Sequence, residues 1–172
     1  CTILRSPPVP SFVTMRRVSN SSIPATREAA WRGLILKESD LTSGDLFTVG
    51  DETFLVESTT PADGALEWFA VKCNATIEHQ RAKKVLDEEG NLVRRWVTLA
   101  TTPAWGQIVT ARLRQEDPGL VDNARYIFEV PKSFGVKLMD RFIYGETAYQ
   151  VESVDDVALP GVVRVQLGVD LR

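Results

Sequence analysis

Two stretches of this 172-residue chain are nearly the same: "GDLFTVGDETFLVES" at residues 44–58 and "MDRFIYGETAYQVES" at residues 139–153. Aligned without a gap, six of the fourteen positions that follow the first residue are identical. In both stretches apolar residues alternate on either side of a short turn that contains Gly, which is the pattern of a tight β-hairpin. The repetition predicts that one hairpin-containing unit occurs twice in the fold.

The repeat extends beyond the hairpins at the same offset. "AWRGLILK" at residues 30–37 aligns with "RYIFEVPK" at residues 125–132, and a polar loop followed by an apolar strand comes after each hairpin. The expected fold is therefore mainly β, with two tandem units, each a small β-barrel or β-sandwich, at residues 12–77 and 107–172. Two unrelated hairpins with similar turn chemistry are the alternative. The residues expected to form the structural turns are Asp45, Gly50, Asp140 and Gly145.

Little helix is expected. One or two turns are predicted in "ATREAAWR" from Ala25 and in "EDPGLVDNA" from Glu116, with Thr26 and Asp117 as caps. Residues 1–11 contain three prolines, which lack an amide donor and fix φ, so this segment is expected to be an extended arm. The sequence leaves open whether the arm is disordered or lies across a neighbouring subunit.

Residues 78–106 are expected to form a long hairpin between the two units, with its tip near Gly90. An isolated two-stranded ribbon is marginally stable in water, so a hairpin of this length is expected to lie against something. Its charged residues are the candidates for subunit or partner contact: Arg81, Lys83, Lys84, Arg94 and Arg95 on the arms, and Asp87, Glu88 and Glu89 at the tip. Three interpretations stay open, namely a solvated hairpin, a contact with DNA phosphates, and docking on a neighbouring subunit.

The composition is that of a soluble globular protein, with 44% hydrophobic and 25% charged residues. The net charge of −3 is too small to indicate a dedicated nucleic-acid binder, and no apolar run is long enough for a transmembrane helix. Cys1 and Cys73 have no metal or redox spacing, and His79 is interpreted as a surface residue on a strand rich in charge. We therefore expect no catalytic residue, no metal, no cofactor and no enzymatic activity.

The second half of the chain resembles a known family through several motifs. From Ala75 it contains "ATIEHQR", "VLDEEGNLVRRWVTLATTPAW", "RYIFEV", "MDRFIYGETAYQVESVDD" and "VVRVQLGVDLR". These motifs are similar to those of the head–tail joining proteins of tailed bacteriophages, the head-closure or stopper family. Matching residues are Ile77, Gln80, Arg81, Asp87, Gly90, Asn91, Trp96, Asp140, Arg141, Tyr144, Tyr149, Val151 and Ser153. Met139 departs from the Gly that is usual before the Asp, and His79 lies within the opening strand.

The resemblance implies a non-enzymatic virion protein that is made in the cytoplasm of the bacterial host. Such proteins form a ring, usually sixfold, that retains the packaged DNA and docks the tail. The implied partners are further copies of the chain, a portal or adaptor protein, and a tail terminator or tail tube protein, with packaged DNA in the lumen and no membrane. A tail-side ring protein and a small-barrel nucleic-acid-binding protein are the alternatives.

Overall fold

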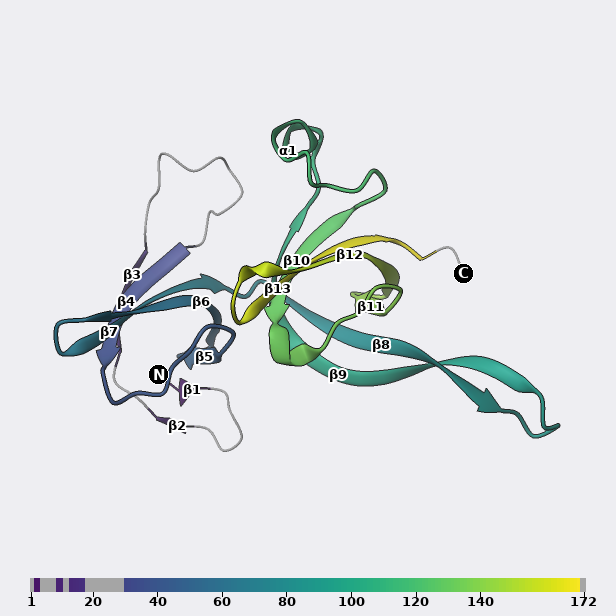
Figure 1. Ribbon diagram of the computed structural model, residues 1–172, viewed down its shortest axis with the longest axis horizontal. Coiled ribbons are helices and arrows are strands. Elements are labelled where there is room, and N and C mark those ends of the chain that lie inside the picture. The colour runs from purple at the N-terminus through teal and green to yellow at the C-terminus, as the bar shows by residue number, and fades with distance from the viewer. Residues whose placement is uncertain (1, 4–8, 11–12, 18–29, 171–172) are drawn as a thin grey trace.

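The computed structural model describes residues 2–3, 9–10, 13–17 and 30–170, and most of these lie in two antiparallel sheets (Figure 1). The first sheet has the order β2-β1-β5-β6-β7-β4-β3 and the second is a closed barrel, β10-β13-β12-β11-β8-β9. The strands of the first sheet are β1 Thr2–Ile3, β2 Val9–Pro10, β3 Val13–Arg17, β4 Ala30–Leu36, β5 Leu46–Val49, β6 Glu52–Ala62 and β7 Ala65–Lys72. Those of the barrel are β8 Ala75–Leu86, β9 Leu92–Ile108, β10 Tyr126–Pro131, β11 Arg141–Tyr144, β12 Thr147–Leu159 and β13 Val162–Val169.

The strand orders confirm the duplication. In the first sheet β5-β6-β7-β4-β3 are neighbours in that order, and in the barrel β11-β12-β13-β10-β9 follow the same order with the same antiparallel pairing. The register between β6 and β7 shifts between Val56 and Ser58, and the register between β12 and β13 shifts at the equivalent place, between Val151 and Ser153. A β-bulge recurring at one position indicates a shared architecture, because bulges are specific local features of a strand pair.

The turns before the two repeated hairpins are also the same. The Asp45 carboxylate accepts a hydrogen bond from the Thr42 amide at 2.6 Å, and the Asp140 carboxylate accepts one from the Lys137 amide at 2.8 Å. The preceding residues, Gly44 and Met139, both have positive φ, 89° and 68°. This conformation favours Gly, so Met139 is a strained replacement that keeps the same turn.

The two copies differ in how the sheet ends. In the barrel β8 pairs with both β11 and β9 and so closes the ring of strands. In the first sheet the short β1 pairs with β5, as β8 does with β11. Among the described residues the pairing then goes on to β2 and does not reach β3. The first copy is therefore an open half-barrel, and the second is a closed barrel.

Two expectations about local structure need correction. The α-helix of the second half is α1 Ala111–Glu116, capped by the Thr110 side chain, and the segment from Asp117 onward is a loop, so Asp117 ends the helix instead of beginning one. The helix predicted from Ala25, with its cap Thr26, lies largely outside the described residues, and its last part belongs to β4. The described residues of the proline-rich arm form β1 and β2 at the edge of the first sheet.

Each sheet has its own core, and a third apolar cluster joins them. The barrel interior is filled by a cluster around Phe128, Phe142 and Leu167, and the half-barrel by one around Phe47 and Trp68. The chain passes from the first sheet to the second at residues 73–74, between β7 and β8, so the expected boundary at residue 77 falls inside β8.

The joining cluster contains Leu55 and Val71 of the first sheet and Trp105 and Val162 of the barrel. Beside it the Gly161 amide donates to the Ser43 hydroxyl at 3.0 Å, and the Ser43 hydroxyl donates to the Glu57 carbonyl. The backbones are so close that a Cβ on Gly161 would lie 1.8 Å from the Ser43 carbonyl oxygen. The two copies are therefore packed directly on each other.

Gly161→Ala is expected to destabilise the protein by about 1–3 kcal/mol, because the added methyl collides with backbone that cannot move aside. The measurement is urea unfolding followed by Trp fluorescence. Gly119→Ala is the matched control, since its φ is also not positive and its Cβ meets only the Asp117 side chain, at 3.2 Å. Equal midpoints for the two variants would contradict the close packing of the copies.

Candidate functional site

The most prominent feature outside the two cores is a two-stranded ribbon, defined here as residues 81–98, which projects from the barrel (Figure 1). At its base, β8 pairs with β11 at residues 78–80 and β9 pairs with β10 at residues 105–108. Beyond the base, β8 and β9 pair only with each other among the described strands, out to Leu86 and Leu92. The ribbon therefore carries unpaired strand edges, which can pair with another chain.

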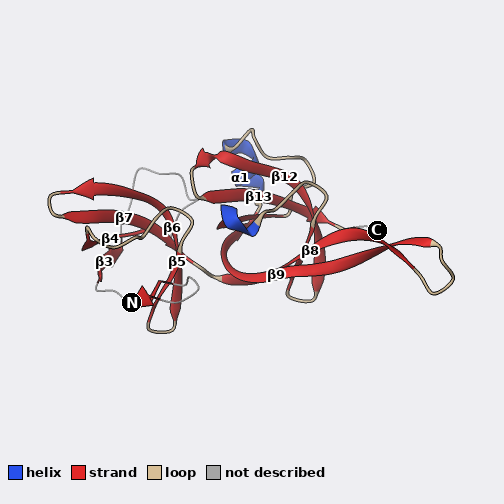
Figure 2. Cartoon of the chain, turned by 60° about the horizontal axis from the view of Figure 1, so that its bottom comes forward, coloured by secondary structure: helices blue, strands red, loops and turns tan. Residues whose placement is uncertain are grey.

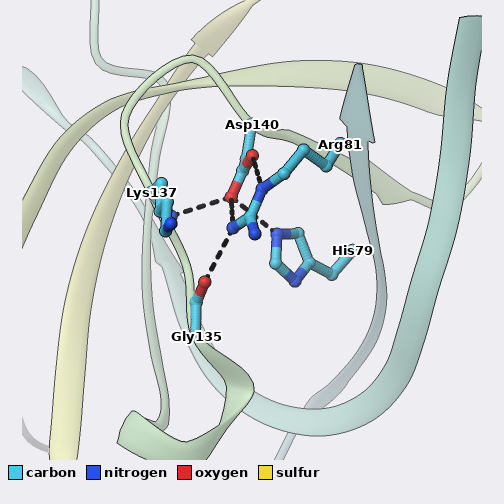
Figure 3. A network of polar contacts seen from close by, with 5 residues as sticks. All are labelled: His79, Arg81, Gly135, Lys137 and Asp140. Atoms are coloured by element: carbon cyan, nitrogen blue, oxygen red, sulfur yellow. Dashed lines mark hydrogen bonds and ion pairs between the residues drawn. The ribbon is translucent and has the colours of Figure 1, made fainter. Parts of the chain in front are cut away.

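The ribbon is held at its root by a buried polar cluster (Figure 3). Arg81 donates two hydrogen bonds of 2.7 Å to the Asp140 carboxylate, through Nε to Oδ1 and Nη2 to Oδ2, and a third to the Gly135 carbonyl at 2.8 Å. His79 Nε2 lies 2.8 Å from Asp140 Oδ2, and the Lys137 amide donates to the same oxygen. His79 and Arg81 are two residues apart on β8, so both face Asp140 from the same side of the strand.

Asp140 is ionised at neutral pH because of these contacts. Burial raises the pKa of its carboxyl, but the hydrogen bonds from Arg81, His79 and the Lys137 amide outweigh burial and hold the pKa below its ordinary value. An ionised carboxylate can accept hydrogen bonds but cannot donate them, so His79 Nε2 must carry the hydrogen and donate it to Asp140. The opposite ring nitrogen, Nδ1, is buried and has no hydrogen-bond partner among the described residues.

The structure corrects the expectation for His79. Its side chain is fully buried inside the barrel, where its ring packs against Phe134 and Phe142 at centroid distances of 5.0 and 5.5 Å. A His–Asp pair can serve acid–base catalysis, but this His has no exposed surface through which a substrate could reach it. The cluster therefore holds strands together, and the sequence signal for it was the alternation of Ile77, His79 and Arg81 toward one face.

A second polar layer fixes the base of the ribbon from outside. The Arg141 guanidinium donates to Gln80 Oε1 at 2.6 and 3.0 Å and lies over the Trp96 ring, 4.3 Å from its centroid. Arg94 covers the same ring at 5.1 Å. Cation–π contacts of this kind add stability at partly exposed positions. The ribbon is thus anchored to β11 through both β8 and β9.

The remaining residues singled out from the sequence lie along the ribbon and at the turns. Lys83, Lys84, Arg94 and Arg95 are exposed on the arms, and Glu88 and Glu89 are exposed at the tip. Asp87 instead shapes the tip, because its carboxylate accepts from the Glu89 and Asn91 amides at 3.0 and 2.8 Å. Gly90, Gly50 and Gly145 occupy turns with positive φ.

Within residues 2–3, 9–10, 13–17 and 30–170, no three His, Cys, Asp or Glu side chains gather in a way that would hold a metal ion. Burial raises the pKa of the Cys73 thiol to about 12, so it is not a nucleophile at neutral pH. In the same residues, no helix has the length and apolar character to cross a membrane.

Comparison with known families matches residues 70–162, more than half of the chain, to the phage head completion proteins. The chain belongs to this family. The matched residues include the whole ribbon, the polar cluster at its root and most of the barrel, so the family features coincide with the closed copy of the repeat. A search of curated proteins finds no match.

Membership in the head completion family establishes the general role. The family consists of structural proteins of bacteriophages, not of enzymes, and a head completion protein belongs to the virion, where it contacts other head or tail proteins. Most of the half-barrel lies before the matched region, which begins within β7. The first copy of the repeat therefore lies largely outside the part of the chain that matches the family.

Asp140→Asn is expected to destabilise the protein by about 3–5 kcal/mol, because it leaves the half-buried Arg81 guanidinium without its counter-charge. The measurement is the free energy of unfolding in urea. Glu116→Gln is the control, since it makes the same carboxylate-to-amide change in an exposed helix pair with Arg112 and is expected to leave the midpoint nearly unchanged. Equal effects of the two substitutions would show that the cluster does not stabilise the barrel.

The same carboxylate predicts a pH dependence. Because the pKa of Asp140 is lower in the folded protein than in the unfolded chain, its contribution to stability is present above about pH 4 and is lost as the pH falls through the folded value. The free energy of unfolding should therefore fall more steeply below about pH 4 in the wild type than in Asp140→Asn. Parallel curves for the two proteins would contradict the ionised state of Asp140.

Proposed function

We propose that this chain is a head-closure, or stopper, protein that forms a ring between the portal or its adaptor and the tail. The ring retains the packaged DNA and presents the surface on which the tail docks. The observation that carries the proposal is the ribbon, which lies inside the family-matched region and projects from the barrel with unpaired edges (Figure 2). A buried polar cluster at its root holds this projection in a defined direction.

Physical reasons support an assembly role for the ribbon. A two-stranded ribbon without a covering layer contributes little to the stability of its own chain. Its distal end exposes Leu86 and Leu92, 67% and 69% accessible, which is costly in water unless a partner covers them. A ring of identical copies provides such a partner at every interface, since rotational symmetry joins two different surfaces of each chain.

The role in a tail-side ring is the nearest alternative, and it differs only in where the protein lies along the particle. A nucleic-acid-binding barrel is the alternative from another class. It predicts that DNA binding by the purified chain falls steeply with salt and is lost in a variant with both Arg94 and Arg95 replaced by Ala.

Electron cryomicroscopy of the virion is the direct test. The expected result is a ring of this chain between the head vertex and the tail, and disruption of its gene should yield DNA-filled heads that leak DNA and do not acquire tails. Copies found only at the distal end of the tail, or heads that retain DNA and join tails without the protein, would contradict the proposal. Imaging particles complemented with the wild-type chain controls for effects on neighbouring genes.

A further inference from the structure

The ribbon carries cations in an arrangement that is unfavourable within a single chain. Lys84 lies directly opposite Arg94 and Lys83 directly opposite Arg95, so two pairs of like charges face each other across the strands. Like charges in directly opposed positions destabilise a strand pair. None of the four forms an ion pair with the described residues. An anionic surface from elsewhere would remove this repulsion.

The two faces of the ribbon each carry two cations, but they differ in the apolar side chains beside these cations. Residues directly opposite share a face, and positions two residues apart along a strand share it too. Lys84 and Arg94 therefore lie on the same face as Leu86 and Leu92, the most exposed aliphatic pair of the ribbon. Paired Leu side chains beside cations fit an acidic protein surface with apolar walls better than they fit the phosphate backbone of DNA. The acidic tip next to them would also repel DNA.

The chain itself contains such a surface on the outside of the barrel. A row of paired residues crosses four strands there, with Trp105 on β9 opposite Glu129 on β10, Glu129 opposite Arg164 on β13, and Arg164 opposite Asp155 on β12. Asp117, from the loop after α1, binds Arg164 at 2.7 Å. These residues line a groove of about 280 Å³.

The groove has an excess of negative charge and apolar walls. Among the described lining residues other than the buried Glu129, which has a contact of its own, Asp117 and Asp155 contribute two carboxylates beside a single guanidinium, Arg164. The accessible apolar walls of the groove are Ala158 and Leu159. The chemistry of the groove is thus complementary to the ribbon face that carries Lys84, Arg94 and the two Leu side chains.

The ribbon of a chain does not point toward its own groove. The β12–β13 turn, from Leu159 to Val162, borders the groove and lies on the side of the barrel next to the first sheet, whereas the ribbon leaves on the other side (Figures 1 and 2). A basic projection on one side and an acidic groove on the other are the two different surfaces that a head-to-tail ring contact requires.

We propose that the ribbon face formed by Lys84, Arg94, Leu86 and Leu92 docks into the groove that Asp117 and Asp155 line in a second copy of this chain. The cations bind the carboxylates of the groove, and the Leu side chains cover its apolar wall. This proposal rests on the proposed ring and specifies which surfaces form its subunit interface.

The test is a charge exchange in phage whose genome lacks the gene and which are complemented with variants of the chain. Lys84→Glu with Arg94→Glu is expected to lower the amount of chain per purified particle, and the titre of infectious particles, at least tenfold, and Asp155→Lys is expected to do the same. Combining the three substitutions in one chain should raise the amount of chain per particle and the titre at least tenfold above those of the ribbon variant or the groove variant alone. Lys83→Glu with Arg95→Glu on the other face, and Asp63→Lys at an exposed turn of the first sheet, are the matched controls and should have much smaller effects.

Thermal unfolding of each purified variant separates loss of docking from loss of folding. A second measurement does not depend on charge reversal: Leu92→Cys and Ala158→Cys are placed in one chain that also carries Cys1→Ser and Cys73→Ala. In assembled particles this chain should form disulfide-linked multimers, which either cysteine alone should not form.

Wild-type chain absent from purified particles would refute the proposed function itself. The ribbon–groove contact would be overturned, and the ring would stand, if wild-type chain is present in the particles and two further results hold. The charge-reversed variants would be incorporated normally or not rescued by the exchange, and the cysteine pair would form no cross-link. If the ribbon variant is incorporated normally but the particles lose DNA, and the groove substitution does not rescue this loss, the ribbon contacts DNA and not the groove of a second copy.

Discussion

The buried carboxylate of Asp140 is the interaction on which the second half of the molecule depends. It accepts hydrogen bonds from Arg81, His79 and the Lys137 amide, and so joins the turn before β11 to β8. β8 is the strand that closes the barrel, and it continues without interruption into the ribbon. Separating Asp140 from its partners would leave a buried charge without a counter-charge, which is strongly destabilising. The same electrostatic constraint therefore fixes both the closure of the barrel and the direction of the ribbon.

The duplication shows how one strand arrangement can serve two purposes. Both copies keep the same Asp turn, the same bulge and the same strand order, and these are the features that a stable small sheet requires. Within the part of the chain that the structure describes, only the second copy has a long strand beside its equivalent of β5, and this strand forms the barrel closure and the projection. The first copy ends in the short β1 and β2 and packs through Ser43 against Gly161 of the barrel.

Membership in the head completion family agrees with a molecule whose polar chemistry is structural. The His79–Asp140 pair is buried in the barrel, and four exposed cations, Lys83, Lys84, Arg94 and Arg95, lie on the ribbon. For a protein whose task is to hold neighbours, the informative surfaces are those that are unfavourable in the isolated chain. Opposed cations and exposed Leu side chains on the ribbon are of this kind.

The sequence by itself determined the β architecture, the duplication and the long hairpin, because strand alternation and turn chemistry are local patterns that appear directly in residue order. It also indicated the family, through motifs concentrated in residues that the barrel and the ribbon use. It failed for His79, since a polar residue on a charged strand is buried only when a distant group, here Asp140, supplies its partner. Two features were decided by the tertiary structure alone: the closure of one copy and not the other, and the row of paired residues from Trp105 to Asp155. Both depend on pairing between strands far apart in the chain.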